Sequence, residues 1–362
     1  IGDRKGRKVT MYASLLMMGI STSIIGILPP AASAGVGVVI VLQLMRLAQC
    51  FGRGGTWGGG ILMAYENVPE NKRSFYAAIP QIGLPIGFGL SSILIAVPTL
   101  LLPEDIFFTW GWRIPFLAAI ILTVIVIRQK GEMMETEDYK KAQAKLEAEE
   151  AEGKKHKVGF IPMVKGYWKT LLLGCGTRWV DGTFYNIFIV WILSYCINWL
   201  GMPLIQTYII TIIACIFKIP FTLFGGWCAQ KLGNTRTFVI GALASAVLSI
   251  PTLKVIELSK GNLAITIIGI VLGWSIAYNL IWAVISSLWS SYFETEVRYS
   301  GISFVYHVPS FLVAGMVPTI CTLLINYGKG DTIYVGIYST VVALISAACA
   351  LALKARHDRG EK

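Results

Sequence analysis

The chain has 362 residues, of which 55% are hydrophobic and only 14% are charged, whereas an ordinary soluble domain has about 25% charged residues. Apolar runs of about 20 residues recur along the whole length, which excludes a soluble globular protein and predicts an all-α membrane protein. The net charge of +11 is better explained by basic loops on one side of a membrane than by nucleic-acid binding.

The sequence predicts ten membrane-spanning helices, each bounded by charged residues or by turn-forming Gly and Pro. Pro and Gly also interrupt many of the spans, and membrane helices tolerate such residues where neighbouring helices satisfy the freed backbone groups. The predicted spans are 9–29, 35–65, 74–102, 112–128, 168–199, 203–229, 237–256, 262–290, 300–326 and 332–354.

Four spans precede the longest polar stretch and six follow it. This stretch, residues 129–166, is rich in Glu, Lys and Ala, so we expect a solvated helix or a partly ordered linker. Carriers built from repeats have equal halves, so we expect two further spans before Ile1 and twelve in all. The predicted units are a transmembrane half at 1–128, the linker, a six-helix half at 167–354 and a tail at 355–362.

Basic residues fall on alternate loops and thereby predict the orientation in the membrane. If residues 1–8 are cytoplasmic, the cytoplasmic segments carry 23 of the 31 Lys and Arg residues and the outer loops carry 4. Positively charged loops remain in the cytoplasm. We therefore expect a protein of the plasma membrane, the inner membrane of the cell, with loop 1–8, linker 129–166 and the C-terminus on the cytoplasmic side.

Two pairs of matching cytoplasmic loops indicate an internal duplication. GDRKGRK at 2–8 is echoed by GWCAQKLGNTR at 226–236, and ENVPENKRSF at 66–75 by YFETEVRYSG at 292–301. In the first loop Asp3 can cap a helix or pair with an arginine, while a glycine permits the tight turn.

These loops resemble those of the major facilitator superfamily, and GDRKGRK resembles the loop between that family's second and third spans. The glycine-rich stretch at 46–60, Gln81, and WGWRIPF at 110–116 resemble, more narrowly, the metabolite:proton symporter family. That family includes carriers of proline and betaine, shikimate, citrate and 2-oxoglutarate. The resemblance implies two pseudo-symmetric halves around a central cavity. Thr56 departs from it, standing where the family usually has Glu.

Polar residues form one-sided stripes along the spans that this resemblance places at the cavity. Arg46, Gln49, Arg53 and Thr56 share one face at helical spacing, and such a stripe faces a helix interface or a water-filled cavity rather than lipid. Arg53 contacts substrate or pairs with an acid in a further span. Arg46 lies on the same path or locks the cytoplasmic loops.

The fifth and eighth spans carry similar stripes. Arg178, Asp181 and Tyr185 share one face, and Trp274, Tyr278 and Trp282 step by four. Asp181 is the one carboxylate inside a predicted span, and it either pairs with Arg178 at i, i+3 or carries a proton. Lys218, in the middle of the sixth span, either contacts substrate or reaches the cytoplasmic interface.

The predicted functional residues form three sets. Those expected to contact substrate are Gln49, Arg53, Thr56, Gln81, Arg178, Tyr185, Tyr278 and Trp282. Proton coupling is expected at Asp181. Gating or structural roles are expected for Asp3, Arg4, Gly6, Arg7, Arg46, Arg73, Arg113 and Arg298.

Charges inside the spans sum to +3, which favours an anionic substrate. We therefore expect a monomeric secondary transporter that takes up a small organic acid, or a zwitterion with a carboxylate, together with protons. Alternatives are a sugar porter or an uncoupled facilitator or exporter and, more remotely, a non-transporting sensor. The spans contain no nucleophile–base pair, metal-ligand cluster or phosphate loop, so we expect no enzyme activity, cofactor or metal.

Overall fold

The computed structural model describes most of the chain, namely residues 6–30, 34–129, 140, 141, 143, 144, 148 and 160–361. Over these residues the regular elements are all helical, and ten helices are long and apolar enough to cross a membrane. The predicted fold class is thereby confirmed. Asp3, Arg4 and most of the linker lie outside the described residues.

The first four predicted spans form an N-terminal group of helices. Proline begins two of its segments, with Pro80 opening a 3-10 turn and Pro115 in the first turn of a helix, where its missing N–H leaves no bond unmade. The helices of this group are α2 (Arg7–Ile27), α4 (Val36–Glu66), α5 (Arg73–Ala78), α6 (Gly83–Leu101), α7 (Glu104–Thr109) and α8 (Ile114–Arg128), joined by the short turns η1 (Glu70–Lys72), η2 (Pro80–Ile82) and η3 (Gly111–Arg113).

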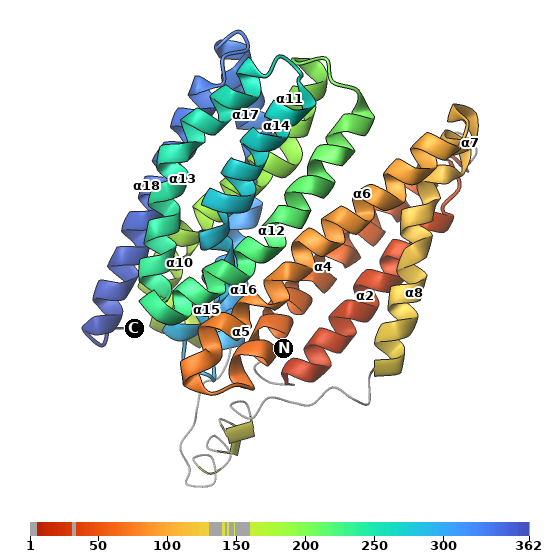
Figure 1. The fold of residues 1–362 in the computed structure, drawn as a ribbon. Coiled ribbons are helices and arrows are strands. Elements are labelled where there is room, and N and C mark those ends of the chain that lie inside the picture. Colours follow the sequence, from red (N-terminus) through yellow and green to blue (C-terminus); the bar gives the residue numbers. More distant parts are fainter. Residues whose placement is uncertain are drawn as a thin grey trace.

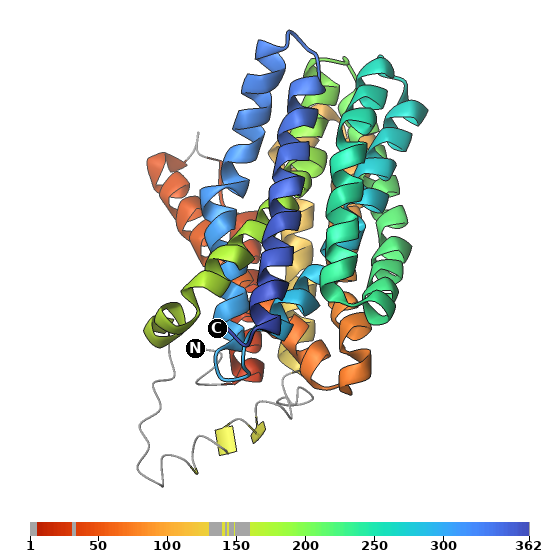
Figure 2. The same cartoon turned by 90° about the vertical axis from the view of Figure 1, so that its left-hand side faces the viewer.

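The other six spans form a C-terminal group. Its first helix bends at Tyr167 (φ −120°, ψ 18°), next to the predicted start of the span, and turns aside in Figure 2. The elements are α10 (Phe160–Asn186), η5 (Ile187–Trp191), α11 (Ile192–Asn198), α12 (Leu204–Leu232), α13 (Asn234–Leu258), α14 (Leu263–Ile270), η6 (Val271–Ala277), α15 (Asn279–Tyr292), α16 (Arg298–Leu312), η7 (Ala314–Met316), α17 (Val317–Tyr327) and α18 (Ile333–Asp358).

The two groups meet at one end of the molecule and diverge at the other (Figure 1). We call the end where α5, α15 and both chain ends lie the linker end. There Ser286 Oγ donates to the carbonyl oxygen of Ala77 at 3.2 Å. Gly226 of α12 brings its backbone against Ala78 of α5, where a Cβ on the glycine would lie 2.7 Å from the alanine methyl.

Glycines allow α2 and α4 to approach closely. A Cβ at Gly52 would lie 2.8 Å from the carbonyl oxygen of Ser14, and one at Gly55 would clash with the Ser14 side chain. These glycines lie on the small-residue face that membrane helices use for close packing. The glycine-rich stretch of the sequence is therefore a helix–helix contact.

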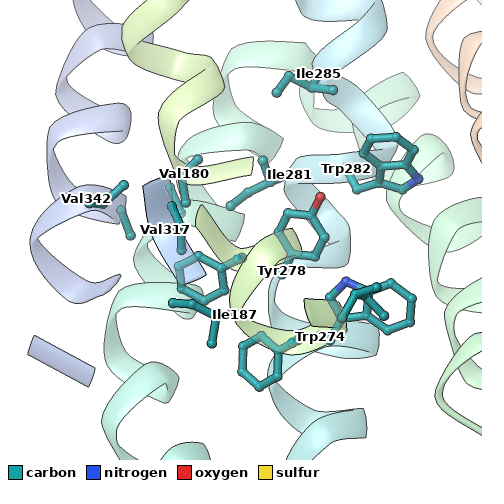
Figure 3. Close-up of a cluster of buried hydrophobic side chains, with 14 of the residues drawn as sticks. Val180, Ile187, Trp274, Tyr278, Ile281, Trp282, Ile285, Val317 and Val342 are labelled. Carbon is teal, nitrogen blue, oxygen red and sulfur yellow. The ribbon is translucent and has the colours of Figure 1, made fainter. Parts of the chain in front are cut away.

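The largest buried apolar cluster belongs almost entirely to the C-terminal group. Val180 of α10 and Ile187 of η5 pack in this cluster with Tyr278 and Ile281 of the eighth span (Figure 3). Across the same region Val342 of α18 packs into the cluster. This core holds in place the helices that carry the buried charged residues of the candidate site.

At the end opposite the linker, Lys254 of α13 reaches the segment before α18. Its Nζ lies 2.7 Å from Oδ1 of Asp331 and 3.0 Å from Oε2 of Glu257. The Lys254 ammonium holds the pKa of Asp331 below its usual range. The cluster is partly exposed, so its role is to position the loop rather than to add much stability.

Candidate functional site

A buried ionic cluster lies within the C-terminal group. Arg178 and Asp181, one turn apart on α10, form an ion pair, and the hydroxyl of Tyr278 donates a hydrogen bond to Oδ1 of Asp181. Asp181 has no exposed surface, Tyr278 is 1% exposed and Arg178 is 6% exposed. A carboxylate out of water requires such donors to remain ionised. The pair that the i, i+3 spacing allows is therefore present.

Arg178 extends this cluster to α16. Its Nη2 donates to Oγ of Ser310 at 3.2 Å, and its Cζ lies 4.2 Å from the centroid of the Tyr306 ring. A planar guanidinium can pair with a carboxylate and stack on a ring at the same time. Arg178 thus links two helices of the C-terminal group through its charge.

Two π-helices, η5 and η6, interrupt the spans that carry this cluster. They meet where Gly273 of η6 faces the ring of Phe188 in η5, with no room for a Cβ. π-Helical turns shift the helical register and occur frequently at functional sites. The shift sets the position of Tyr278, which directly follows η6.

Lys218 of α12 lies on the other side of Tyr278 and has no exposed surface. Its Nζ donates to the carbonyl oxygen of Trp274 at 3.3 Å and lies 4.4 Å from the ring centroids of both Trp274 and Tyr278. Lys218 is enclosed in the helix bundle, so the alternative in which it reaches the interface does not hold.

Gln81 joins the two groups between the ionic cluster and the linker end. Its Nε2 donates to the carbonyl oxygen of Trp282 at 3.1 Å, and the Trp282 indole donates to the carbonyl oxygen of Gln81 at 3.1 Å. The indole of Trp57 donates to Oε1 of Gln81 at 3.2 Å. Trp57 also stacks on Tyr306, with centroids 4.0 Å apart. We call Trp57, Gln81, Trp282 and Tyr306 the middle contact.

The stripe on α4 divides between contacts to α2 and exposed arginines. Gln49 donates to Oγ1 of Thr22 at 2.7 Å, and Thr56 faces the sulfur of Met18 at 3.5 Å. Arg46 and Arg53 are exposed.

Arg46 lies 20 residues before the end of α4, or about 30 Å at 1.5 Å per residue. This distance is too great for the predicted contact with the loop at the linker end, so that alternative for Arg46 is corrected. The helix instead places Arg46 in the half of the span nearer the opposite end.

A second ionic cluster closes the linker end. Glu66 at the end of α4 is 3.0 Å from Nη1 of Arg298 and 3.5 Å from Nε of Arg7. Arg7 also donates to the carbonyl oxygen of Thr295 at 2.9 Å. These residues are buried and come from three spans in both groups. Two of the predicted gating arginines thus meet at one carboxylate.

The remaining predicted gating residues lie at the ends of helices. Gly6 precedes α2 with φ 96°, a conformation that favours glycine. Arg73 is 3.7 Å from Glu70. Arg113 donates to the carbonyl oxygen of Leu28 at 3.0 Å, which ties the end of α2 to the start of α8. Tyr185 is half-buried and faces Phe88 of the N-terminal group, with centroids 5.9 Å apart.

Among the residues of these contacts that were not in the predicted sets, Trp57, Glu66 and Tyr306 join the two groups. Trp57 stands within the glycine-rich stretch, where one large side chain with an N–H donor among small residues indicates a specific contact. Glu66 was placed in a loop, although an acid that directly follows an apolar span is such a signal too. Tyr306 has no signal in the sequence, because its ring is met by residues from other spans.

Ten candidate spans in two groups within the described part of the chain, with charged side chains buried inside the bundle, are typical of a helical membrane transporter. The chain belongs to the Major Facilitator Superfamily, whose family model matches residues 1–318. It is 32% identical to the inner membrane metabolite transport protein YhjE of Escherichia coli, over 99% of this chain and 80% of that protein.

Other relatives are transporters as well. The chain is 30% identical to the shikimate transporter of Escherichia coli, over 98% of this chain and 79% of that protein. It is 27% identical to the proline/betaine transporter of Salmonella typhimurium, over 99% of this chain and 71% of that protein. The protein is therefore a transporter of small molecules and not an enzyme.

The fold is also that of solved major facilitator structures. The proton:xylose symporter XylE bound to 6-bromo-6-deoxy-D-glucose superposes with a TM-score of 0.74 at 16% identity, over 97% of this chain and 80% of that one. The major facilitator fold predicted from the loops is thereby confirmed.

Proposed function

We propose that the protein takes up a small organic acid, or a zwitterion that bears a carboxylate, by proton symport with alternating access. The observation that carries this proposal is the buried cluster of Arg178, Asp181 and Tyr278. The relatives named for shikimate, proline and betaine support it, because each of those compounds bears a carboxylate.

Asp181 is the proposed proton carrier. When its carboxylate takes a proton, its attraction for Arg178 falls, and the guanidinium becomes available to a substrate carboxylate. A guanidinium offers two parallel donors to such a group. Tyr278 would then donate to the substrate or keep the protonated acid in place. Proton binding and substrate binding are coupled in this scheme because both depend on one ion pair.

Arg53 is the proposed second contact for the substrate. It lies near the middle of α4 and is exposed, and no described carboxylate lies within ion-pair distance of it. Tyr185, Gln49 and Thr56 would line the same path. Gln81 and Trp282 would contact substrate only when the middle contact opens, because they bond to each other across the two groups.

Alternating access would proceed by rocking of the two groups. The ionic cluster of Arg7, Glu66 and Arg298 would hold the linker end closed and release it when the groups rock. Arg73 and Arg113 would fix the loops at the two ends. Arg46 would have a gating or structural role in the half of α4 nearer the end opposite the linker. The positive-inside distribution of the loops supports a cytoplasmic location for the linker end. The protein would act as a monomer in the plasma membrane.

The experiment is uptake of labelled carboxylates into proteoliposomes with an imposed proton gradient. Asp181→Asn keeps the shape but removes the titratable group, so we expect loss of gradient-driven accumulation. Exchange of internal for external substrate, which needs no net proton movement, should persist. Asp105→Asn, an exposed acid in the short helix α7, is the matched control and should behave as the wild type. Gradient-driven accumulation by the Asp181→Asn variant would refute the assignment.

A further inference from the structure

The ammonium of Lys218 occupies an aromatic cage. Two ring centroids, those of Trp274 and Tyr278, lie 4.4 Å from Nζ, and the carbonyl oxygen of Trp274 accepts a hydrogen bond from it at 3.3 Å. Aromatic faces of this kind bind quaternary ammonium ligands in many proteins. Here the cation in the cage belongs to the chain itself.

The surrounding helices hold Lys218 in this place. Its carbonyl oxygen accepts hydrogen bonds from Nδ2 of Asn279 at 2.8 Å and from Oγ1 of Thr222 at 2.9 Å. Asn279 and Thr222 also bond to each other at 3.1 Å. All three residues have no exposed surface. The cage and its cation are therefore a built feature of α12 and α15.

Charge around the cage is unbalanced. Tyr278 separates Lys218 from the pair of Arg178 and Asp181, since its ring faces the lysine and its hydroxyl bonds the aspartate. With Lys218 protonated, two cations and one carboxylate would leave an excess of one positive charge in this buried region. Among the described residues, no carboxylate lies within ion-pair distance of Lys218. An anionic substrate in this region would supply the counter-charge that keeps both cations ionised.

We infer that Lys218 determines substrate specificity, because its ammonium fills the cage that the cationic group of a zwitterion would otherwise occupy. The carrier then takes organic anions without a cationic group and discriminates against carboxylates that bear a quaternary ammonium. This inference rests on the proposed carboxylate transport and narrows its substrate class.

The test compares Lys218→Ala, which removes both the ammonium and its stem from the cage, with the wild type. Glycine betaine is the probe, and binding is measured as the shift in thermal unfolding temperature of the purified protein. We expect no shift for the wild type and a clear shift for Lys218→Ala. Lys218→Arg keeps a cation and should resemble the wild type. Lys231→Ala, at an exposed lysine on the same helix, is the matched control.

Uptake in proteoliposomes gives the second readout. Glycine betaine should inhibit labelled carboxylate uptake by Lys218→Ala about tenfold better than by the wild type, the size of effect expected of a desolvated cation–π contact. Betaine binding to the wild type, or a folded Lys218→Ala variant that gains none, would overturn the inference. Failure of the proposed function has a different signature, namely absence of wild-type carboxylate uptake, and leaves the binding comparison able to decide.

Discussion

At the scale of single residues, the buried carboxylates of the described residues form the centres of two separate clusters. One centres on Asp181 inside the C-terminal group, and the other on Glu66 between the groups. Each carboxylate pairs with at least one arginine, because an ionised acid that is buried requires a partner of opposite charge. In the proposed function, the first cluster exchanges a proton and contacts substrate, and the second lies where the two groups would part.

Arg178→Lys should strongly reduce uptake while leaving the protein in the membrane. An ammonium is a point charge that cannot contact Asp181, Ser310 and the face of Tyr306 together. We expect a loss of about tenfold or more in the uptake rate, corresponding to about 1.4 kcal/mol or more. Initial rates in proteoliposomes measure it.

Arg236→Lys provides the control for this substitution, since Arg236 is exposed on α13. Its uptake should match the wild type. If Arg178→Lys also transports at the wild-type rate, a charge alone is sufficient at this position and the shared contacts of the guanidinium have no role in transport.

Residue spacing predicted the pairing in one of these clusters but not the pairing in the other. Arg178 and Asp181 are three residues apart on one helix, so their pairing follows from local geometry. Glu66 meets Arg298 across 232 positions. No periodicity within a span carries that information, and only the assembled fold brings the two residues together.

At the scale of helices, irregular turns and glycines position the site. The π-helices η5 and η6 lie in the two spans that carry the ionic cluster. Neither π-helix follows from residue propensity, because the neighbouring helices determine where an extra residue is accommodated. The glycine contacts on α4 were predictable, because small residues at four-residue spacing indicate close packing.

Gly55→Ala should destabilise the protein. A methyl there meets Ser14 of α2, and overpacking of this kind costs about 1–3 kcal/mol. Gly60→Ala on the same helix is the matched control, since no atom lies within 4 Å of its Cβ position, and replacing glycine in a helix gains up to about 1 kcal/mol. Thermal unfolding in detergent micelles should rank Gly60→Ala at or above the wild type and Gly55→Ala below it. Equal shifts for the two variants would contradict the packing account.

At the scale of the whole molecule, the two groups are closed at the linker end and diverge at the other (Figure 1). The ten spans and their order could be predicted because each buries an apolar run long enough to cross a bilayer. The relative tilt of the groups could not, since it depends on contacts between distant helices. The proposed alternating access requires at least one other arrangement, in which these contacts are broken.

Glu66→Gln should favour opening of the linker end. Removing one charge from a buried ion pair costs about 3–5 kcal/mol, and here that cost falls on the closed arrangement. A cysteine introduced at Gly58, where a Cβ would lie 3.3 Å from Oγ of Ser303 across the groups, should react faster with a maleimide in the Glu66→Gln background. The native cysteines would first be replaced in both backgrounds.

Glu70→Gln controls for loss of a nearby acid, because Glu70 is exposed and its ion pair with Arg73 is long, at 3.7 Å. Its labelling rate should equal that of the parent. Equal rates for both variants would show that the Glu66 cluster does not hold the linker end closed.

The middle contact has an optical consequence. Trp57 lies 4.0 Å from the Tyr306 ring centroid and 5.8 Å from that of Trp289, with its indole bonded to Gln81. Separation of the groups would move this indole from packed surroundings into water. Its fluorescence emission would then shift to longer wavelength. The carrier thus holds an intrinsic fluorophore at the boundary that would open in the proposed cycle, and rocking could be followed without an added label in a variant that keeps Trp57 and replaces the other tryptophans.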